Sequence, residues 1–276
     1  MFYIFLKNKN TTIQQSQTIG STISVKESDE LNTYYHIYSN LSNENFSISK
    51  LDESLAFYEL IELYTHLQIN NFKNICIGDF SESDCFKHFV EYKISNYNYH
   101  SLNYFSTPML KFDILFFNAW IDNPFYIIYT ICKYQRNNGY AIIKLDYKDL
   151  NFIYLLTTLF SKTIICRPIV MSNGSEDYYL ICQKFNNTYD SEIEILSKNS
   201  VTCNIPLHFV NYVNEIFVLM KQQFLVNRKN TFFIKLLNSE KKELTISKNL
   251  YNCVKWCENH DIPYNEVKTF LTNFNL

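Results

Sequence analysis

Glycine is the residue type that this 276-residue sequence lacks most clearly, with four in the whole chain, where an average protein would carry roughly 7%. The four are Gly20, Gly78, Gly139 and Gly174. No two of them are close enough to form a G-x-G-x-x-G motif, a Walker A loop or a kinase glycine-rich loop. The sequence therefore excludes the nucleotide-binding sites that depend on these motifs.

Alanine and arginine are also scarce, with three of each, whereas asparagine occurs 33 times. Tyrosine (22) and phenylalanine (23) are abundant as well. This profile is typical of AT-rich codons, so part of the glycine depletion is genomic and the asparagine count indicates nothing about function. Codon bias does not remove the need for glycine at strained backbone positions, so its absence from a site that requires it remains informative.

Neither sign of charge dominates, because 25 basic residues face 27 acidic ones and the net charge is -2. A global basic field that would gather nucleic acid is therefore excluded. Only Arg136, Arg167 and Arg228 could offer a guanidinium fork to a phosphate. Long apolar runs are missing too, so we expect no membrane span, and the start MFYIFLKNKN is too short for a secretory signal.

The cysteines indicate a reducing compartment. Three of the eight lie in apolar, strand-like runs (NICIGD, TIICRP and YYLICQ), where cysteine behaves as a small hydrophobic residue. We therefore expect free thiols and a cytoplasmic protein. Cys253, Cys257 and His260 would share one helical face and resemble part of a zinc site, but a second ligand pair is missing. Helix packing is the favoured interpretation, and we expect no metal.

The sequence divides into three regions that differ in their pattern of apolar and polar residues. Residues 1–50 predict an N-terminal arm with short strands at Phe2–Lys7 and Thr33–Tyr38. Residues 51–190 predict a compact domain that begins with a helix at Asp52–Gln68, where apolar and polar positions alternate with helical spacing. Residues 191–276 predict a helical extension.

Apolar strands alternate with helices through the middle region. The predicted strands are Asn74–Gly78, Phe112–Asn118, Tyr140–Leu145, Thr163–Pro168 and Tyr178–Lys184, and the helices are Asp84–Lys93, Pro124–Gln135 and Leu150–Ser161. We expect the Asn137–Gly139 turn to end the second of these helices. The alternation predicts an α/β fold with a mostly parallel sheet covered on both faces. The short connection between the last two strands implies one antiparallel edge strand.

The C-terminal extension predicts a long amphipathic helix at Pro206–Val226, followed by helices at Lys248–His260 and Asn265–Phe274. These helices would most simply cover the sheet. The alternative is that one apolar face binds a partner subunit.

A family resemblance lies in the second half of the middle region. The segment Gly139–Leu145 (GYAIIKL), then Arg167-Pro168 and Ser172–Cys182 (SNGSEDYYLIC), resembles the C-terminal half of FtsJ-like (RrmJ) RNA 2′-O-methyltransferases. The resemblance covers roughly residues 52–185 and is good over 139–184. It implies a Rossmann-like methyltransferase fold, S-adenosylmethionine as the cofactor, and a Lys-Asp-Lys-Glu tetrad that methylates a ribose hydroxyl.

The tetrad carries over only in part. Lys144 matches the second lysine and Glu176 matches the glutamate, but Asn118 stands in place of the aspartate and Glu59 in place of the first lysine. With two carboxylates around it and no second cation, Lys144 is expected to stay protonated. We therefore expect a poor general base and a degenerate enzyme, because a base must be neutral when it takes up a proton.

The cofactor turn departs further from the family. In the family a glycine-rich turn follows the first strand, but here the turn from Gly78 to Asp84 (GDFSESD) contains one glycine, a phenylalanine and three acids. Gly78 and Asp79 take the cofactor-binding positions, where Asp79 would repel the carboxylate of S-adenosylmethionine. The length of the next segment also indicates a reduced cofactor site. Ile94–Lys111 has room for one strand and a connection, whereas a methyltransferase sheet needs two strands in this part of the chain. We therefore expect that no cofactor binds.

Three functions follow. The favoured one is a catalytically degenerate accessory or regulatory subunit, similar to the small stimulatory subunit of poxvirus-type mRNA capping enzyme, which Tyr140–Leu145 and Phe209-Val210-Asn211 resemble. That resemblance implies a viral or plasmid gene and a heterodimer with a larger capping or RNA-processing subunit. The second is an active S-adenosylmethionine-dependent RNA (cap) 2′-O-methyltransferase. The third is a nucleic-acid-binding or structural protein that reuses the fold. Aromatic residues of Tyr92–Tyr104 could stack RNA bases, but a tyrosine-rich strand and loop from AT-biased codons is the favoured interpretation of that segment.

Overall fold

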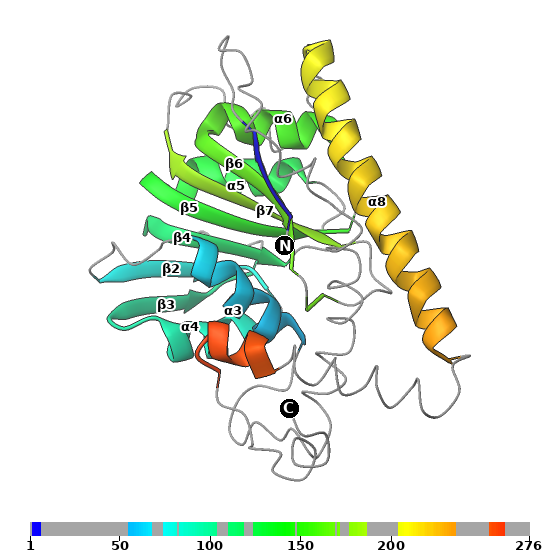
Figure 1. The fold of residues 1–276 in the computed structure, drawn as a ribbon. Helices are drawn as coiled ribbons and strands as arrows, with labels where there is room; N and C mark the ends of the chain where they lie inside the picture. Colours follow the sequence, from blue (N-terminus) through cyan, green and yellow to red (C-terminus); the bar gives the residue numbers. More distant parts are fainter. Residues whose placement is uncertain are drawn as a thin grey trace. The chain divides into compact units, whose positions relative to one another are not determined.

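The computed structural model describes eleven stretches of the chain: residues 2–6, 55–67, 74–81, 83–103, 110–118, 124–146, 148–168, 170–171, 177–186, 204–235 and 254–262. Their helices and strands are drawn in Figure 1. The chain divides into two compact units. The first takes residues 1–20, 69–167 and 176–219, and the second takes residues 21–68, 168–175 and 220–276.

The first unit is built on one sheet of seven strands in the order β1-β6-β7-β5-β4-β2-β3. The strands are β1 (Phe2–Leu6), β2 (Ile75–Asp79), β3 (Tyr97–Ser101), β4 (Phe112–Asn118), β5 (Gln135–Leu145), β6 (Phe160–Arg167) and β7 (Tyr178–Phe185). Strands β2 to β5 pair in parallel, whereas β7 is antiparallel to both β5 and β6. The α/β class and the mostly parallel sheet are thus confirmed.

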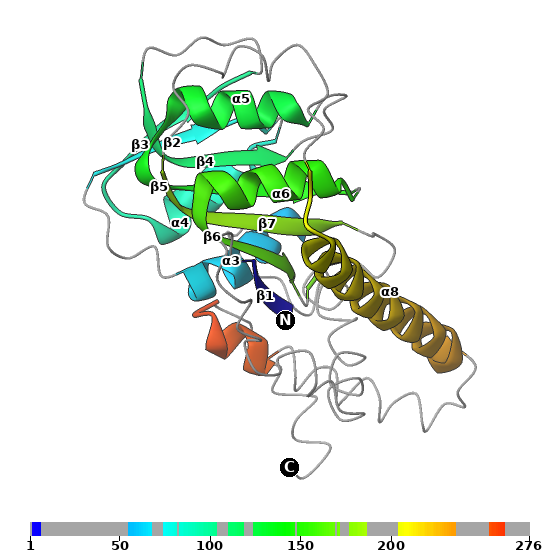
Figure 2. The ribbon, with the colours of Figure 1, turned by 90° about the horizontal axis from the view of Figure 1, so that it is seen from above.

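Helices cover both faces of this sheet. α5 (Phe125–Tyr134) and α6 (Leu150–Leu159) lie side by side over one face (Figure 2). α4 (Cys85–Lys93) packs on the opposite face, where its Phe86 ring stacks on Phe116 of β4 at 4.1 Å between centroids. Each helix turns apolar side chains inward, and those of Phe86, Phe89 and Val90 are buried on α4. Burial on both faces explains why the central strands are continuous apolar runs in the sequence.

The position of the antiparallel strands differs from the expectation. The last two strands, β6 and β7, are antiparallel neighbours, but neither is at the edge: β7 lies between β5 and β6, and the antiparallel edge strand is β1, which pairs with β6. A short connection requires only that β6 and β7 be neighbours. It does not decide which of the two lies next to β5.

The expected end of α5 is also wrong. The helix ends at Tyr134, and β5 begins at Gln135, so Gly139 lies in a strand. A Cβ atom on Gly139 would come within 2.1 Å of the Gln135 Nε2 and 2.9 Å of the Asp113 backbone oxygen. Glycine is therefore required here by close packing and not as a helix cap.

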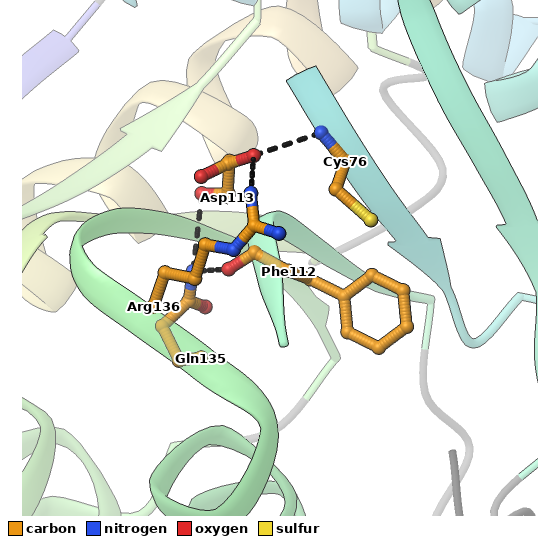
Figure 3. Close-up of polar contacts among 5 residues, drawn as sticks. All are labelled: Cys76, Phe112, Asp113, Gln135 and Arg136. Atoms are coloured by element: carbon orange, nitrogen blue, oxygen red, sulfur yellow. Dashed lines mark hydrogen bonds and ion pairs between the residues drawn. The ribbon is translucent and has the colours of Figure 1, made fainter. Parts of the chain in front are cut away.

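Polar contacts hold the amino ends of β2, β4 and β5 together beside Gly139 (Figure 3). The Asp113 carboxylate accepts hydrogen bonds from the Cys76 backbone N–H at 2.8 Å and from the Arg136 guanidinium at 2.7 Å. The Gln135 side-chain amide donates to the backbone oxygens of Phe112 at 3.0 Å and Asp113 at 3.1 Å. This end of the sheet is thus closed by the protein's own groups.

The second unit contains α3 (Leu55–Leu67), a helix at 254–259 and the C-terminal part of α8 (Leu207–Lys235). The Trp256 ring lies 6.3 Å from Tyr58 and 4.5 Å from His260, between centroids. α8 is longer than predicted, with 29 residues. Within the described stretches, no helix has the length and apolar character needed to cross a membrane.

Some expectations fall outside the described residues. They are the strand Thr33–Tyr38, the helix Asn265–Phe274 and the side chain of Cys253. Cys257 is buried and His260 packs on Trp256, which agrees with the packing interpretation for these two residues. The domain boundaries at 50 and 190 stay a prediction.

Candidate functional site

The carboxyl ends of the parallel strands contain the candidate site. In an open α/β sheet, ligands bind there at the point where the strand order reverses. The chain places β3 on one side of β2 and β4 on the other, so this switch point lies between β2 and β4. The residues that meet it are Asp79, Phe80 and Ser81 after β2, and Asn118 at the end of β4.

Asp79 faces the interior at this point. Its side chain is 1% exposed. The carboxylate accepts a hydrogen bond from the Ser81 backbone N–H at 2.7 Å and another from the Tyr99 hydroxyl of β3. Burial raises the pKa of Asp79 above its usual range, although these hydrogen bonds oppose the shift. The pKa of Tyr99 is also strongly raised, first by burial and then by its hydrogen bond to Asp79.

Phe80 fills the space next to Asp79. Its ring is 2% exposed and stacks on Phe117 of β4, with 5.0 Å between centroids and 9° between planes. Its backbone N–H donates to the Phe116 oxygen at 2.9 Å. In a dinucleotide site the backbone of this turn approaches the ligand. Here the N–H groups of Phe80 and Ser81 are both bonded within the protein.

The end of β3 lacks a ribose-binding acid. In Rossmann sites an Asp or Glu about 20 residues after the glycine turn binds the ribose hydroxyls. In this chain β3 ends in Ser101, Leu102 and Asn103, and none of the described residues 97–103 is acidic. Leu102 donates its N–H to the Asp79 backbone oxygen at 2.7 Å. As the spacing predicted, the described residues between α4 and β4 contain one strand.

Gly78 serves packing inside the sheet. A Cβ atom at this position would lie 2.9 Å from the Leu115 side chain and 3.1 Å from the Phe112 ring. The glycine is therefore explained by close contact with β4. Its predicted role in cofactor binding, like that of Asp79, stays a prediction.

The structure brings together two of the predicted tetrad positions. Lys144 on β5 and Asn118 on β4 are direct neighbours in the sheet register. The Lys144 Nζ lies 3.8 Å from the Asp177 carboxylate and 5.5 Å from the centre of the Tyr179 ring. The side chains of Lys144 and Asp177 are 16% and 30% exposed, so this contact faces solvent. Both the carboxylate and the ring face stabilise a positive charge.

Asp177 was not predicted from the sequence, and its neighbour Glu176 was named instead. Glu176 lies outside the described residues. The Asp177 backbone oxygen also accepts a hydrogen bond from Arg167 at 3.1 Å, so the start of β7 is tied to the end of β6. Its position directly before an apolar strand that pairs with β5 is the signal that could have identified it.

Glu59 belongs to α3 in the second unit, where its side chain is buried. Its proposed replacement of the first tetrad lysine stays a prediction. No group of three or more metal-binding side chains gathers anywhere in the described stretches.

Comparison with known proteins gives structural similarity only. The sequence matches no protein family and no curated protein. A protein of Plasmodium falciparum assigned as a ribosomal RNA methyltransferase is 18% identical with a TM-score of 0.36, over 48% of this chain and 97% of that one. A protein of Listeria monocytogenes assigned as a class I S-adenosylmethionine-dependent methyltransferase is 9% identical with a TM-score of 0.37, over 71% and 79%. The N-methyltransferase NodS of Bradyrhizobium japonicum, in complex with S-adenosylhomocysteine, is 12% identical with a TM-score of 0.31, and the match covers 56% of this chain and 98% of that one.

All three TM-scores are below 0.5, so the fold assignment rests on the strand order and not on these matches. The sheet reverses its order between β2 and β4 and inserts the antiparallel β7 between β5 and β6. This arrangement defines an open α/β sheet with a switch point between β2 and β4.

Proposed function

We propose that this chain is a non-catalytic, methyltransferase-like subunit that stimulates a methyltransferase partner in mRNA capping or RNA modification. One observation carries the proposal. Asp79 and Phe80 at the switch point are buried, and their side chains contact Tyr99 and Phe117 of the same chain.

Electrostatics supports the loss of cofactor binding. S-adenosylmethionine carries a carboxylate, and a site for it needs free N–H donors or cations. At the switch point the N–H groups of Phe80 and Ser81 are already bonded, and the Asp79 carboxylate is within the fold. Asp84 adds a second negative charge, which acts to raise the pKa of Asp79 further. The proposed subunit therefore uses no cofactor of its own.

The surroundings of Lys144 support the loss of catalysis. A general base must be neutral when it takes up the proton of the acceptor hydroxyl. Lys144 forms an ion pair with Asp177 and lies against the Tyr179 ring, and its neighbour across the sheet is Asn118, where the family has an aspartate. Cys132, Cys166 and Cys182 are buried and form no disulfide, which fits the reducing cytoplasm in which we place the subunit.

Calorimetry with S-adenosylmethionine tests the proposal directly. We expect no binding heat for the purified chain at millimolar cofactor. A dissociation constant in the micromolar range would contradict it. Purification of the tagged chain from its native source tests the accessory role, since co-purification with a larger capping or RNA-processing subunit supports that role, and recovery of the chain alone opposes it.

The second candidate is an active RNA 2′-O-methyltransferase, favoured by the placement of Lys144 beside Asn118 at the carboxyl ends of β4 and β5. Transfer of a labelled methyl group to capped RNA tests it. Activity that Lys144→Ala abolishes, while leaving the unfolding free energy nearly unchanged, would establish this candidate and reject the first.

A further inference from the structure

β3 is the outer strand of the sheet that the described residues form, and one of its edges pairs with none of the other described strands. The Asn96 oxygen accepts from Ile75 N–H at 3.1 Å, and Leu102 donates to the Asp79 oxygen at 2.7 Å, so the even-numbered residues face β2. Because peptide groups alternate along a strand, those of Tyr97, Tyr99 and Ser101 face outward. Among the strands that the structure describes, none pairs with this edge.

The edge carries none of the usual protection against pairing. Natural edge strands are blunted by charged side chains, prolines or bulges. β3 reads YNYHS, without a lysine, arginine, acid or proline. It pairs with β2 in unbroken register from Tyr97 to Ser101. Such an edge can accept a further strand through main-chain hydrogen bonds.

The neighbouring helix indicates which strand would fit. On α4 the buried side chains of Phe86, Phe89 and Val90 define the inner face, and the exposed Lys87 and Glu91 lie one turn apart on a single flank. A right-handed β2-α4-β3 connection turns that flank toward β3. In agreement, the Glu91 charge is among the causes that raise the pKa of Tyr99 on β3, after burial, Asp79 and Asp84.

We propose that two copies of this chain pair through β3, antiparallel about a twofold axis, with Tyr99 opposite Tyr99 of the second copy. An antiparallel strand pair also makes the two α4 helices antiparallel. Lys87 then faces Glu91 of the second copy, and Glu91 faces its Lys87. The Lys87 and Glu91 charges on this flank are complementary to their own twofold image, as a symmetric interface requires. This favours a second copy over a foreign strand.

This association is separate from the proposed function. It uses the outer edge of β3 and the flank of α4, and it requires neither an active nor an inactive site between β2 and β4. A failure of either proposal therefore leaves the other standing.

Charge reversal tests the interface. Sedimentation velocity of the full chain over a range of concentrations is expected to show a reversible dimer. Lys87→Glu and Glu91→Lys each place like charges across the axis and should weaken dimerisation by about tenfold or more. The double variant K87E/E91K restores the complementary pairs and should dimerise like the parent chain. An equimolar mixture of the two single variants should form a mixed dimer.

A proline at the edge tests the strand pairing itself. Ser101→Pro removes an outward N–H without removing a bond to β2, so it should weaken the dimer and leave the monomer folded. Asn98→Pro is the matched control, because it removes a bond to β2 and should destabilise the monomer. A chain that stays monomeric at all concentrations would overturn the inference. So would a dimer that tolerates Ser101→Pro and both single charge reversals.

Discussion

The carboxyl end of the sheet has two unlike halves. Beyond β2 and β4, Asp79 and Phe80 are 1% and 2% exposed and make their contacts inside the fold. Near the end of β5 and just before β7, the side chains of Lys144 and Asp177 are 16% and 30% exposed and form an ion pair that water reaches. The same edge of one sheet has therefore become hydrophobic core in one half and remained surface in the other.

In the proposed function, this difference separates the cofactor half of the ancestral site from the acceptor half. The half between β2 and β4 is where a Rossmann-like sheet would hold a cofactor, and the half at β5 and β7 carries the lysine that would meet the acceptor. A phenylalanine that becomes buried contributes about 1.5–3 kcal/mol, so filling the first half stabilises the fold. Replacing the charged side chains Lys144 and Asp177 in the second half would give no comparable gain in fold stability.

The largest expected effect comes from Phe80→Ala. The substitution removes a ring stacked in the core and should lower the free energy of unfolding by about 3–5 kcal/mol. Urea denaturation measures this value, and Tyr92→Ala, at a side chain that is 37% exposed, is the control with little expected change. A loss below about 1 kcal/mol for Phe80→Ala would remove the distinction between the two halves.

Tyr99→Phe should have the next largest effect. It removes the hydroxyl that donates to the buried Asp79 carboxylate and leaves that group with fewer donors. The expected loss is about 1–3 kcal/mol in the free energy of unfolding. Tyr97→Phe, two residues away on the same strand and half-buried, is the matched control. Equal losses for the two variants would mean that the hydrogen bond to Asp79 contributes nothing specific.

Asp79→Asn should change the pH dependence of stability. Because the pKa of Asp79 is raised in the folded state above the ordinary value of 3.8, the folded protein binds this proton more tightly than the unfolded chain. Protonation of Asp79 therefore contributes to the unfolding free energy. This contribution is complete below pH 3.8 and is lost as the pH rises through the folded pKa, so the unfolding free energy falls between these two values. Denaturation curves at several pH values should show this fall for the parent chain and a flatter profile for Asp79→Asn. An exposed acid, Asp146→Asn, is the control, and an unchanged slope in Asp79→Asn would contradict the expectation.

The smallest effect is expected at Lys144. A solvent-accessible ion pair contributes about 0–1 kcal/mol, so Lys144→Ala and Asp177→Ala should each change the unfolding free energy by less than about 1 kcal/mol. A double-mutant cycle on this pair measures the coupling. A coupling above about 2 kcal/mol would place Lys144 and Asp177 in a dry environment like that of Asp79.

Much of the fold could be predicted because its central strands are buried on both faces. The runs at 74–78, 112–118 and 140–145 are mostly apolar, with Asp113 and Lys144 as their charged residues, and each lies in a strand of the sheet. β3 could not be found in this way, since an edge strand is half-exposed and YNYHS has no apolar run. Only the spacing between α4 and β4 indicated that one strand belonged there.

The candidate site was predictable where it depends on neighbouring strands. Asn118 and Lys144 both end apolar strands that are successive in the chain, so their pairing followed from a parallel sheet. The contact between Asp79 and Tyr99 depends instead on the register of β2 and β3 and on the direction of each side chain. Neither the strand register nor the side-chain direction can be predicted from composition and spacing.

The edge strand β1 has a consequence for synthesis of the chain. Phe2 pairs with Arg167, so the ribosome synthesises the first residue of this pair long before the second. At about 5–20 residues per second, the first strand waits on the order of ten seconds or more in the nascent chain. We therefore expect the sheet to close from its middle outward, with β1 joining last, and the apolar sequence FYIFL to be a binding target for chaperones until then.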